Sequence, residues 1–309
     1  MSCAETIKSR RLFYFSRWLV NIGVVNLYTN RAANIRKTWL LMAIFFGVVI
    51  GAGFVFSRVY GSPGILYIAV GFSILMNAVS YWYSDKIVIK MTGAKELPDE
   101  GEYKNIHNIV ENLSITAGLP KPRLYLIGDP APNAFATGRN AEHAVVAVTT
   151  GLLERLERVE LEGVLAHELS HIGNKDMLVS TVAVVLVGVI VLMADFFFRI
   201  TFWGGIGGNN REGGQMKLIL FVVAIAFLII APLLAQAMKF AVSRRRESLA
   251  DASGALLTRY PEGLARALEK IAEDPNELRT ANDATAHLYF ASPFRGKDTK
   301  RWLHKLFLT

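Results

Sequence analysis

Residues 165–171 read Leu-Ala-His-Glu-Leu-Ser-His, with two histidines four positions apart and a glutamate directly after the first. Residues four apart share one face of an α-helix, so His167 and His171 can present their imidazoles to a single metal ion. Glu168 lies beside them and can reach the water that such an ion activates rather than the ion itself. The alternative is two ordinary histidines on an exposed helix, and the apolar residues around the motif argue against it. This stretch therefore predicts a helix that binds a metal.

The apolar residues of the chain are concentrated in four long runs. The 309-residue sequence is 52% hydrophobic, and about 20 predominantly apolar residues suffice to cross the hydrocarbon core of a bilayer. Four runs approach or reach this length, at residues 39–56, 64–83, 177–198 and 218–238. A buried core helix can imitate one such run, but four in one chain indicate membrane spans. Residues 12–28 are only partly apolar and read either as an interfacial amphipathic segment or as a tail.

Lysine and arginine are distributed unevenly about these runs. All but four of the 34 basic residues lie before the first run, between the second and the third, or after the fourth. The exceptions lie in the two connecting loops and are Arg58, Arg199, Arg211 and Lys217. Two spans separate each basic region from the next, so all three regions share one side, which the positive-inside rule makes cytoplasmic. The net charge of +8 is explained in this way, and the sequence shows no basic helix that would indicate binding to nucleic acid.

The four spans divide the chain into five segments. We expect a cytoplasmic N-terminal segment (1–38), a transmembrane hairpin (39–84), the first half of a cytoplasmic domain (85–176), a second hairpin (177–238) and the second half of that domain (239–309). The two halves meet in space because the second hairpin returns the chain to the side that it left. Both termini are predicted to be cytoplasmic.

The cytoplasmic halves carry short strand and helix patterns. Strands are predicted in short apolar stretches bounded by turn residues, at 87–90, 123–127 and 144–148. Helices are predicted where apolar residues recur with a helical period, at 105–117, 161–172 and 246–257. The predicted fold class is therefore α+β, with four transmembrane helices and a cytoplasmic domain that contains a small sheet and the His-Glu-x-x-His helix.

A catalytic zinc site needs a third protein ligand and one position left open. The only cysteine, Cys3, precedes the first span and is far from the motif in the chain. Glu247 is the best candidate, because the motif ends just before the third span and Glu247 follows just after the fourth. Asp251 lies one helical turn later and suits a hydrogen bond to the remote N–H of a ligand histidine. The alternative is a charged helix face in which both carboxylates neutralise Arg244 to Arg246.

Several motifs together resemble those of one family. They are His-Glu-Leu-Ser-His-Ile-Gly-Asn-Lys-Asp (167–176), the Ser-Arg-Arg-Arg-Glu stretch that leads to Asp251 (243–251), Arg-Lys-Thr-Trp-Leu-Leu-Met (36–42), Asn-Ala-Phe-Ala-Thr-Gly (133–138), and His-Leu-Tyr-Phe (287–290) followed by Pro293. This pattern covers nearly the whole chain and resembles the HtpX membrane proteases, which are bacterial and archaeal relatives of the CAAX prenyl endopeptidases. HtpX relatives commonly continue past a Leu-Phe-x-Thr like that at 306–309 into a His-Pro-Pro stretch, whereas this sequence stops at Thr309.

The resemblance implies a gluzincin-like zinc peptidase with one Zn²⁺ per chain. In that family the two histidines and the glutamate after the second hairpin bind zinc, which corresponds to His167, His171 and Glu247. The glutamate of the motif, here Glu168, is the catalytic base in that family.

The resemblance also points to residues around the metal. Asp251 and Asn174 are expected to support the ligands from behind. The substrate backbone is expected to pair with an edge strand. The residues of that strand are Asn133, Ala134, Phe135, Ala136, Thr137 and Gly138. Apart from the resemblance, the chemistry of peptide hydrolysis calls for a donor to the oxyanion. His287 and Tyr289 are the candidates, and the alternative for each is a side chain that only packs.

The expected function is that of a zinc endopeptidase of the cell (inner) membrane, with a cytoplasmic active site and membrane or misfolded proteins as substrates. A non-catalytic membrane scaffold that keeps zinc for folding would need a fourth ligand, and no suitably placed His or Cys is evident in the sequence. An intramembrane metalloprotease would bury the motif in a span, but Asn174, Lys175 and Asp176 follow it here. A prenyl-protein processing protease is a variant of the main interpretation, and its known relatives carry more spans.

Overall fold

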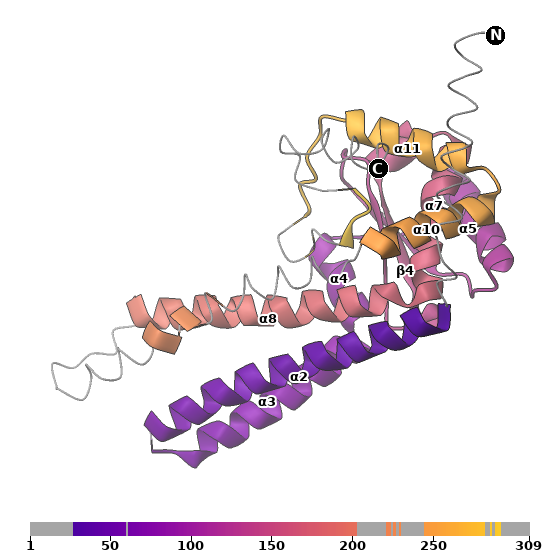
Figure 1. The fold of residues 1–309 in the computed structure, drawn as a ribbon. Coiled ribbons are helices and arrows are strands. Elements are labelled where there is room, and N and C mark those ends of the chain that lie inside the picture. The colour runs from indigo at the N-terminus through magenta and orange to yellow at the C-terminus, as the bar shows by residue number, and fades with distance from the viewer. Residues whose placement is uncertain are drawn as a thin grey trace, which may run out of the picture.

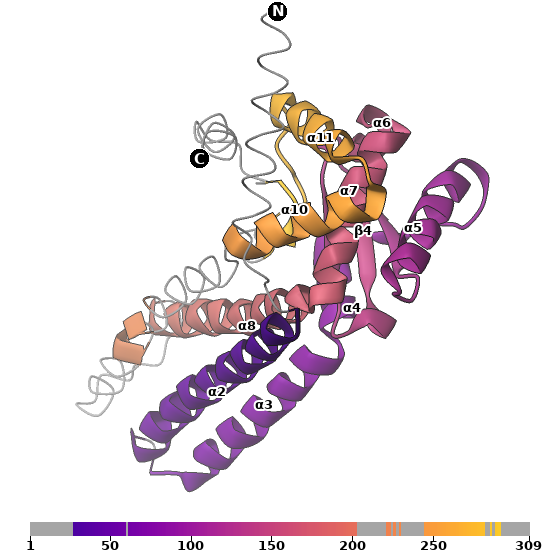
Figure 2. The same cartoon turned by 45° about the vertical axis from the view of Figure 1, so that its right-hand side comes forward.

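The computed structural model describes residues 27–59, 61–202, 244–281 and 288–291, together with positions 221–223, 225, 226, 229 and 285. Long helices run side by side, and a globular part made of shorter helices and a small sheet lies at one end of them (Figure 1 and Figure 2). The protein is thus divided into an apolar helical part and a mixed globular part.

Three helices of the described chain are long and apolar enough to cross a membrane. They are α2 (Leu27–Val59), α3 (Pro63–Trp82) and α8 (Asp176–Phe202). They cover the first three apolar runs of the sequence, which confirms the helices expected there. The fourth expected span, 218–238, lies outside the described residues except for a few helical positions.

Small residues allow α2 and α3 to approach each other closely. A Cβ added at Gly53 of α2 would lie 2.3 Å from the Cβ of Ala69 of α3, a distance that only glycine tolerates. Gly61, with φ 63°, makes the turn between the two helices, and Pro63 begins α3. Close approach of this kind is typical of helix pairs in membranes, where packing and not water exclusion holds helices together.

Among the described residues, the sheet has four strands in the order β1-β2-β4-β3. They are β1 (Lys95–Glu96), β2 (Arg123–Ile127), β3 (Ala134–Thr137) and β4 (Val145–Thr149). β2 and β4 are parallel, and β3 runs antiparallel to β4. The strands expected at 123–127 and 144–148 are confirmed. In the part of the chain that the structure describes, β3 is the last strand on its side of the sheet, so its outer backbone groups pair with no further strand.

The strand expected at 87–90 is wrong, because these residues belong to helix α4 (Ser84–Thr92). The short apolar run Ile-Val-Ile suggested a strand, but the buried side chains Ser84, Val88 and Thr92 recur every four residues, as on one face of a helix. Gly93, with φ 66°, ends the helix in the left-handed region. The short strand β1 follows it, and two residues are too few for a sequence pattern to reveal.

The globular part is built around α7 (Arg158–Asn174). Three helices pack on it, α5 (Lys104–Ala117), α10 (Arg244–Thr258) and α11 (Pro261–Glu273). α7 and α8 also contact β3. The short elements α6 (Thr150–Arg155), η1 (Gly101–Tyr103) and η2 (Ala141–His143) complete this part. Helix α7 is therefore enclosed by helices from distant parts of the sequence. Helix α5 precedes the third apolar run, whereas α10 and α11 follow the fourth.

The globular part and the apolar part are joined directly where α7 ends. Helix α7 stops at Asn174, Lys175 adopts φ 57°, and Asp176 begins α8. A single left-handed residue thus turns the chain from the central helix into α8, whose span is the most buried of the three described apolar spans. This short connection holds the end of α7 in place against the membrane-type helices.

Candidate active site

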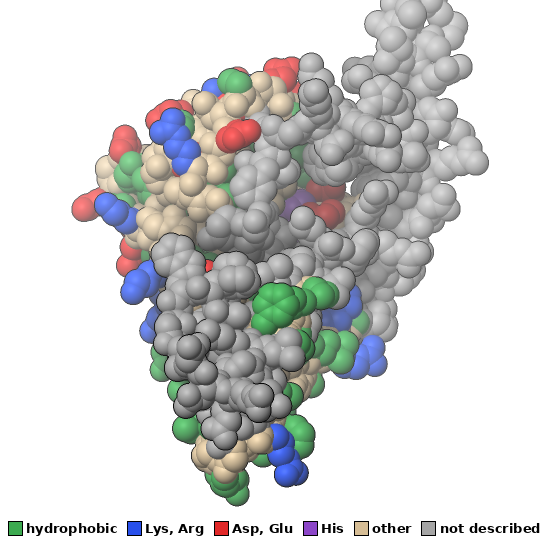
Figure 3. Space-filling model, turned by 90° about the vertical axis from the view of Figure 1, so that its left-hand side faces the viewer, with side chains coloured by type: hydrophobic (Ala, Val, Ile, Leu, Met, Phe, Trp, Pro, Cys, Tyr) green, Lys and Arg blue, Asp and Glu red, His purple; other side chains and the backbone are tan. Residues whose placement is uncertain are grey.

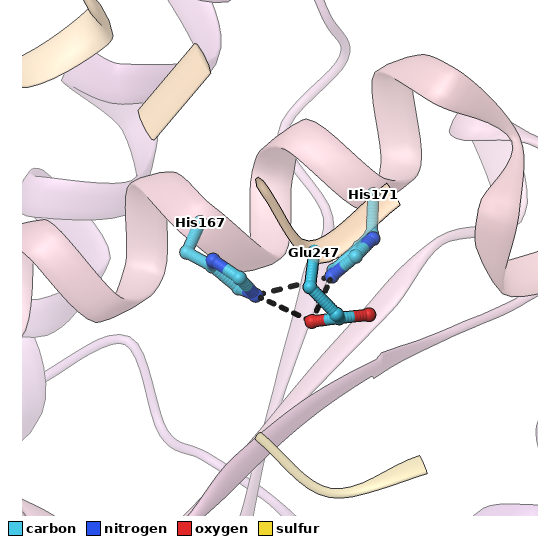
Figure 4. Close-up of side chains that lie close together, drawn as sticks. All are labelled: His167, His171 and Glu247. Atoms are coloured by element: carbon cyan, nitrogen blue, oxygen red, sulfur yellow. Dashed lines mark hydrogen bonds and ion pairs between the residues drawn. The ribbon is translucent and has the colours of Figure 1, made fainter. Parts of the chain in front are cut away.

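His167 and His171 lie one turn apart on α7, and Glu247 reaches them from the first turn of α10 (Figure 4). The Nε2 atoms of the two histidines are 3.1 Å apart. The Oε2 atom of Glu247 lies 3.6 Å from Nε2 of His167 and 3.7 Å from Nε2 of His171. Three ligand-type atoms from two distant parts of the sequence therefore meet at one point.

These separations fit the donor set of a zinc ion. Tetrahedral ligands at normal Zn–N and Zn–O distances are about 3.3 Å from one another, and the three measured separations lie between 3.1 and 3.7 Å. Among the described residues, His167, His171 and Glu247 form the one group of His, Cys, Asp or Glu side chains that is clustered tightly enough to hold a metal. Glu247 is partly exposed, which leaves room for water and substrate beside the ligands.

Each histidine is supported from behind by a carboxylate. Nδ1 of His167 lies 2.9 Å from Oδ1 of Asp251. Nδ1 of His171 lies 3.3 Å from Oδ2 of Asp176. A carboxylate at Nδ1 fixes the proton there and directs Nε2 towards a metal, an arrangement common to zinc-binding histidines. Asp251 was expected in this position from its spacing after Glu247.

Asn174 was expected to support a ligand as well, and that role stays a prediction. Its side chain has no recorded bond to either histidine in the described chain, and its backbone carbonyl accepts a 3.4 Å hydrogen bond from Asn34. The side chain that contacts His171 belongs to Asp176, two residues further on. The spacing of Asp176 in the sequence gives no hint of this, because the left-handed turn at Lys175 brings its carboxylate back towards His171.

The three candidate ligands have strongly shifted pKa values. Burial lowers the pKa of His167, but its hydrogen bonds to Asp251 and then Glu247 outweigh burial and raise the pKa to about 9. Burial also lowers the pKa of His171, and its bonds to Asp176 and Glu247 raise it to about 10. Burial raises the pKa of Glu247, but the two histidines bring it far below its ordinary value. A metal cation that binds here displaces the protons from the two histidines, because only the neutral imidazole binds a metal.

Glu168 is 2% exposed and faces strand β3. Burial raises the pKa of its carboxyl, while the neighbouring histidines and a backbone hydrogen bond from Ala136 act in the opposite direction. The Glu168 carboxyl thus lies beside the two histidines and close to the backbone of the edge strand at Ala136. A carboxyl in this place can exchange a proton with a molecule bound between them.

The outer side of β3 is partly occupied by the segment 288–291. The Phe290 N–H donates a 2.9 Å hydrogen bond to the Ala134 carbonyl. The Asn133 side chain donates to the Ala291 carbonyl at 2.9 Å and accepts from the Ala291 N–H at 3.1 Å. The Phe290 ring packs edge-to-face against His167, with centroids 4.9 Å apart. This contact between the C-terminal part and the metal site could not be read from the His-Leu-Tyr-Phe motif alone.

The remaining residues of the expected substrate strand are also positioned. Phe135 points to the core and packs against Tyr289 at a centroid distance of 5.1 Å. The Thr137 hydroxyl lies 3.0 Å from that of Thr181 on α8. Gly138, with φ 138°, approaches the backbone of His143 so closely that a Cβ would lie 2.4 Å from its carbonyl oxygen. The strand thus connects the sheet to an apolar helix at the level of the metal site.

Of the two candidate oxyanion donors, His287 lies outside the described residues. Tyr289 is buried, and burial raises the pKa of its phenol to about 12, with Thr280 lowering it and Asp129 adding to the rise. Neither Thr280 nor Asp129 belongs to the group formed by His167, His171 and Glu247. The role of Tyr289 as an oxyanion donor stays a prediction.

Histidine and acidic side chains are visible on the face of the molecule shown in Figure 3. His171 lies three residues before the end of α7, and α8 begins at Asp176, so the candidate metal site is near the boundary between the two parts of the protein.

Comparison with known proteins gives consistent matches. A model of Peptidase family M48 matches residues 100–304. The Protease HtpX homolog of Caldanaerobacter subterraneus subsp. tengcongensis is 43% identical over 272 residues, which cover 87% of this chain and 90% of that protein. The Protease HtpX homolog of Pyrococcus furiosus is 45% identical over 264 residues, covering 85% of this chain and 88% of that protein. The crystal structure of S. mikatae Ste24p matches with a TM-score of 0.43 and 19% identity, over 80% of this chain and 60% of that chain.

The family match spans more than half of the chain, and the HtpX relatives align over most of both sequences. The matched range includes His167, His171 and Glu247, and three described helices are long and apolar enough to anchor the protein in a membrane. The chain therefore belongs to peptidase family M48, among the membrane-associated zinc metalloproteases of the HtpX type.

Proposed function

We propose that this chain binds one zinc ion through His167, His171 and Glu247 and cleaves peptide bonds with Glu168 as the general base. The observation that carries the proposal is the meeting of the three ligand atoms within 4.8 Å of one another, with a buried carboxyl beside them. Zinc, when bound, acts as a Lewis acid that activates water and polarises the peptide carbonyl. The remaining steps depend on the side chains and backbone of the protein.

Glu168 is placed to accept the proton of the attacking water and to deliver it to the leaving amine. Its carboxyl is held by the backbone of Ala136 and lies next to the two ligand histidines without being one of the clustered ligands. A buried carboxyl with a raised pKa is suited to this exchange, because a general base works best when its pKa lies near the pH at which the enzyme operates.

The substrate backbone is proposed to lie beside β3, near Ala136 and Gly138. Strand addition requires unoccupied backbone groups on the outer side of β3. The Ala134 carbonyl and the Asn133 side chain bond to residues 290 and 291. The Gly138 N–H donates to the Thr181 hydroxyl at 3.4 Å, and the Ala136 backbone interacts with Glu168, so a substrate strand near Gly138 would replace these weaker contacts. An extended chain that also pairs with Ala134 would have to displace that segment.

The proposed location is the cell membrane, with the site and both termini on the cytoplasmic side and a fourth span at 218–238. The distribution of Lys and Arg in the sequence supports this orientation. A site at the junction of the globular part and the apolar helices suits peptide segments close to a bilayer surface. We therefore propose membrane or misfolded proteins as substrates and membrane protein quality control as the role.

Cleavage of an unfolded test protein by the purified, detergent-solubilised chain tests this proposal, with metal analysis of the same sample. We expect about one zinc per chain, loss of cleavage with a chelator, and recovery when zinc is restored. A Glu168→Gln sample excludes a contaminating protease. Bound zinc with no cleavage of any unfolded or membrane protein would favour the scaffold alternative instead. Selective cleavage of a prenylated peptide over its unprenylated form would favour prenyl-protein processing.

A further inference from the structure

A buried asparagine of the first apolar helix contacts the junction between α7 and α8. Nδ2 of Asn34 lies 2.6 Å from Oδ1 of Asp176 and 3.4 Å from the backbone carbonyl of Asn174. Asn34 is 2% exposed and Asp176 is 5% exposed. The bond joins two helices that are 142 residues apart in the sequence. It is a short, charge-assisted bond in a buried place, where such bonds are strong.

The Asp176 carboxylate is held on both of its oxygens. Oδ1 accepts from Asn34, and Oδ2 lies 3.3 Å from Nδ1 of His171. The bond to His171 is longer than the 2.9 Å bond between Asp251 and His167. The orientation of the His171 ring therefore depends on how firmly the Asp176 carboxylate is held, since a rotation of that carboxylate moves Oδ2 away from Nδ1.

The place of Asn34 in the sequence supports a role beyond helix packing. It lies in the apolar span Ala32–Arg58, where a buried amide is costly unless it is hydrogen-bonded. Thr38, one turn later on the same buried face, satisfies its hydroxyl within α2 by donating to the Asn34 carbonyl. Asn34 instead directs its amide to another helix and to the carboxylate behind a metal ligand.

We propose that Asn34 is a positioning residue for the zinc ligand His171 and acts on it through Asp176. The proposal rests on the ligand set given under the proposed function. It means that the metal site is completed by the first membrane helix, and that its affinity for zinc depends on the position of α2 against α8. A displacement of α2 by about 1 Å would lengthen the bond beyond the normal range for hydrogen bonds.

The test is a double-mutant cycle on the full-length protein in detergent, with zinc affinity measured by competition with a chromogenic chelator. Asp176→Asn is expected to weaken zinc binding about 10- to 100-fold, the usual effect of losing such a partner. Asn34→Leu is expected to weaken it about tenfold, at the lower end of that range, because it acts through Asp176. The double variant should be little weaker than Asp176→Asn alone, because both changes remove the same support.

Thr38→Val is the matched control for disturbed helix packing. It keeps the shape of the side chain on the same face of α2 and touches neither Asp176 nor a ligand in the described contacts. We expect unchanged zinc affinity in this variant, and an unchanged absorption spectrum of bound Co²⁺. Asn34→Leu should alter that spectrum, because the orientation of the His171 ring is changed.

The outcomes are distinguishable. Zinc affinity that is unchanged in Asn34→Leu and lowered in Asp176→Asn would overturn the role of Asn34, as would additive effects in the double variant. If Asn34→Leu does not fold, Asn34→Asp replaces it in the cycle: it sets two carboxylates against each other, and adding Asp176→Asn should restore part of the lost affinity. No restoration would overturn the direct contact. Stoichiometric zinc in His171→Ala would instead contradict the ligand set itself.

Discussion

Gly254 of α10 lies against the backbone of His167 of α7. A Cβ added at Gly254 would lie 3.1 Å from the backbone nitrogen of His167 and 3.3 Å from its Cα. These contacts involve rigid helix backbone, which cannot move aside as a flexible side chain can. The missing side chain at Gly254 therefore allows α10 to lie close enough to α7 for Glu247, two turns earlier, to reach the two histidines.

Gly254→Ala is expected to destabilise the protein by about 1–3 kcal/mol, the usual cost of adding a methyl group to a closely packed contact. It should also weaken zinc binding, because α10 is pushed outward and carries Glu247 with it. Gly173→Ala on α7 is the control, since its Cβ would meet only a Leu119 side-chain atom at 3.8 Å. Thermal unfolding and chelator competition measure both effects. Equal zinc affinity in the two variants would contradict the link between α10 spacing and the site.

Glu168→Gln is expected to lower cleavage by at least about 10²- to 10⁴-fold, the range attributed to a general base. Zinc content should stay near that of the parent, because Glu168 is not among the clustered ligand atoms. Initial rates on an unfolded protein and zinc per chain after dialysis give the two measurements. Near-normal turnover in this variant would remove Glu168 from the role of base.

Glu247→Ala and Asp251→Ala are expected to differ in their effect on zinc. The first leaves two histidines as ligands, so zinc should be lost on dialysis. The second removes the carboxylate 2.9 Å from His167 Nδ1, and a loss of about 10- to 100-fold in affinity is expected, with zinc retained at saturating concentration. A charged helix face that serves only Arg244 to Arg246 would predict small and similar effects from both changes. Full zinc and full activity in Glu247→Ala would exclude it as a ligand.

The proposed orientation is open to test with single cysteines in a Cys3→Ser background. Ser62, in the turn between α2 and α3, and Glu100, before η1, are both exposed. In intact cells, a membrane-impermeant thiol reagent should label Ser62→Cys and leave Glu100→Cys unlabelled. After the membrane is permeabilised, both should react, which controls for accessibility. Labelling of Glu100→Cys from outside would reverse the orientation.

Much of the fold was accessible to sequence reasoning because it depends on local patterns. Helix α7 and the first three apolar helices have long periodic or uniformly apolar sequences, and β2 is a short apolar stretch between turn residues. The segment 87–90 was misassigned because a short apolar run of β-branched residues fits a strand as well as a helix, whereas the burial of Ser84, Val88 and Thr92 follows the period of a helix. Short segments follow their tertiary surroundings more than their own sequence.

The sequence by itself determined which residues could form the site: the spacing of His167 and His171 follows from the geometry of one helix, and Glu247 from the order of the apolar runs. The spacing after Glu247 also suggested Asp251 as the support of His167, but only the tertiary structure decided what supports His171 and what lies beside β3. The carboxylate behind His171 belongs to Asp176 and bonds to Asn34, while Phe290 bonds to Ala134 of β3 and Ala291 to the preceding Asn133. Such contacts join residues more than a hundred positions apart, or depend on a single left-handed turn. No periodicity records them, because they are set by how the helices and strands pack and not by the sequence of any one element.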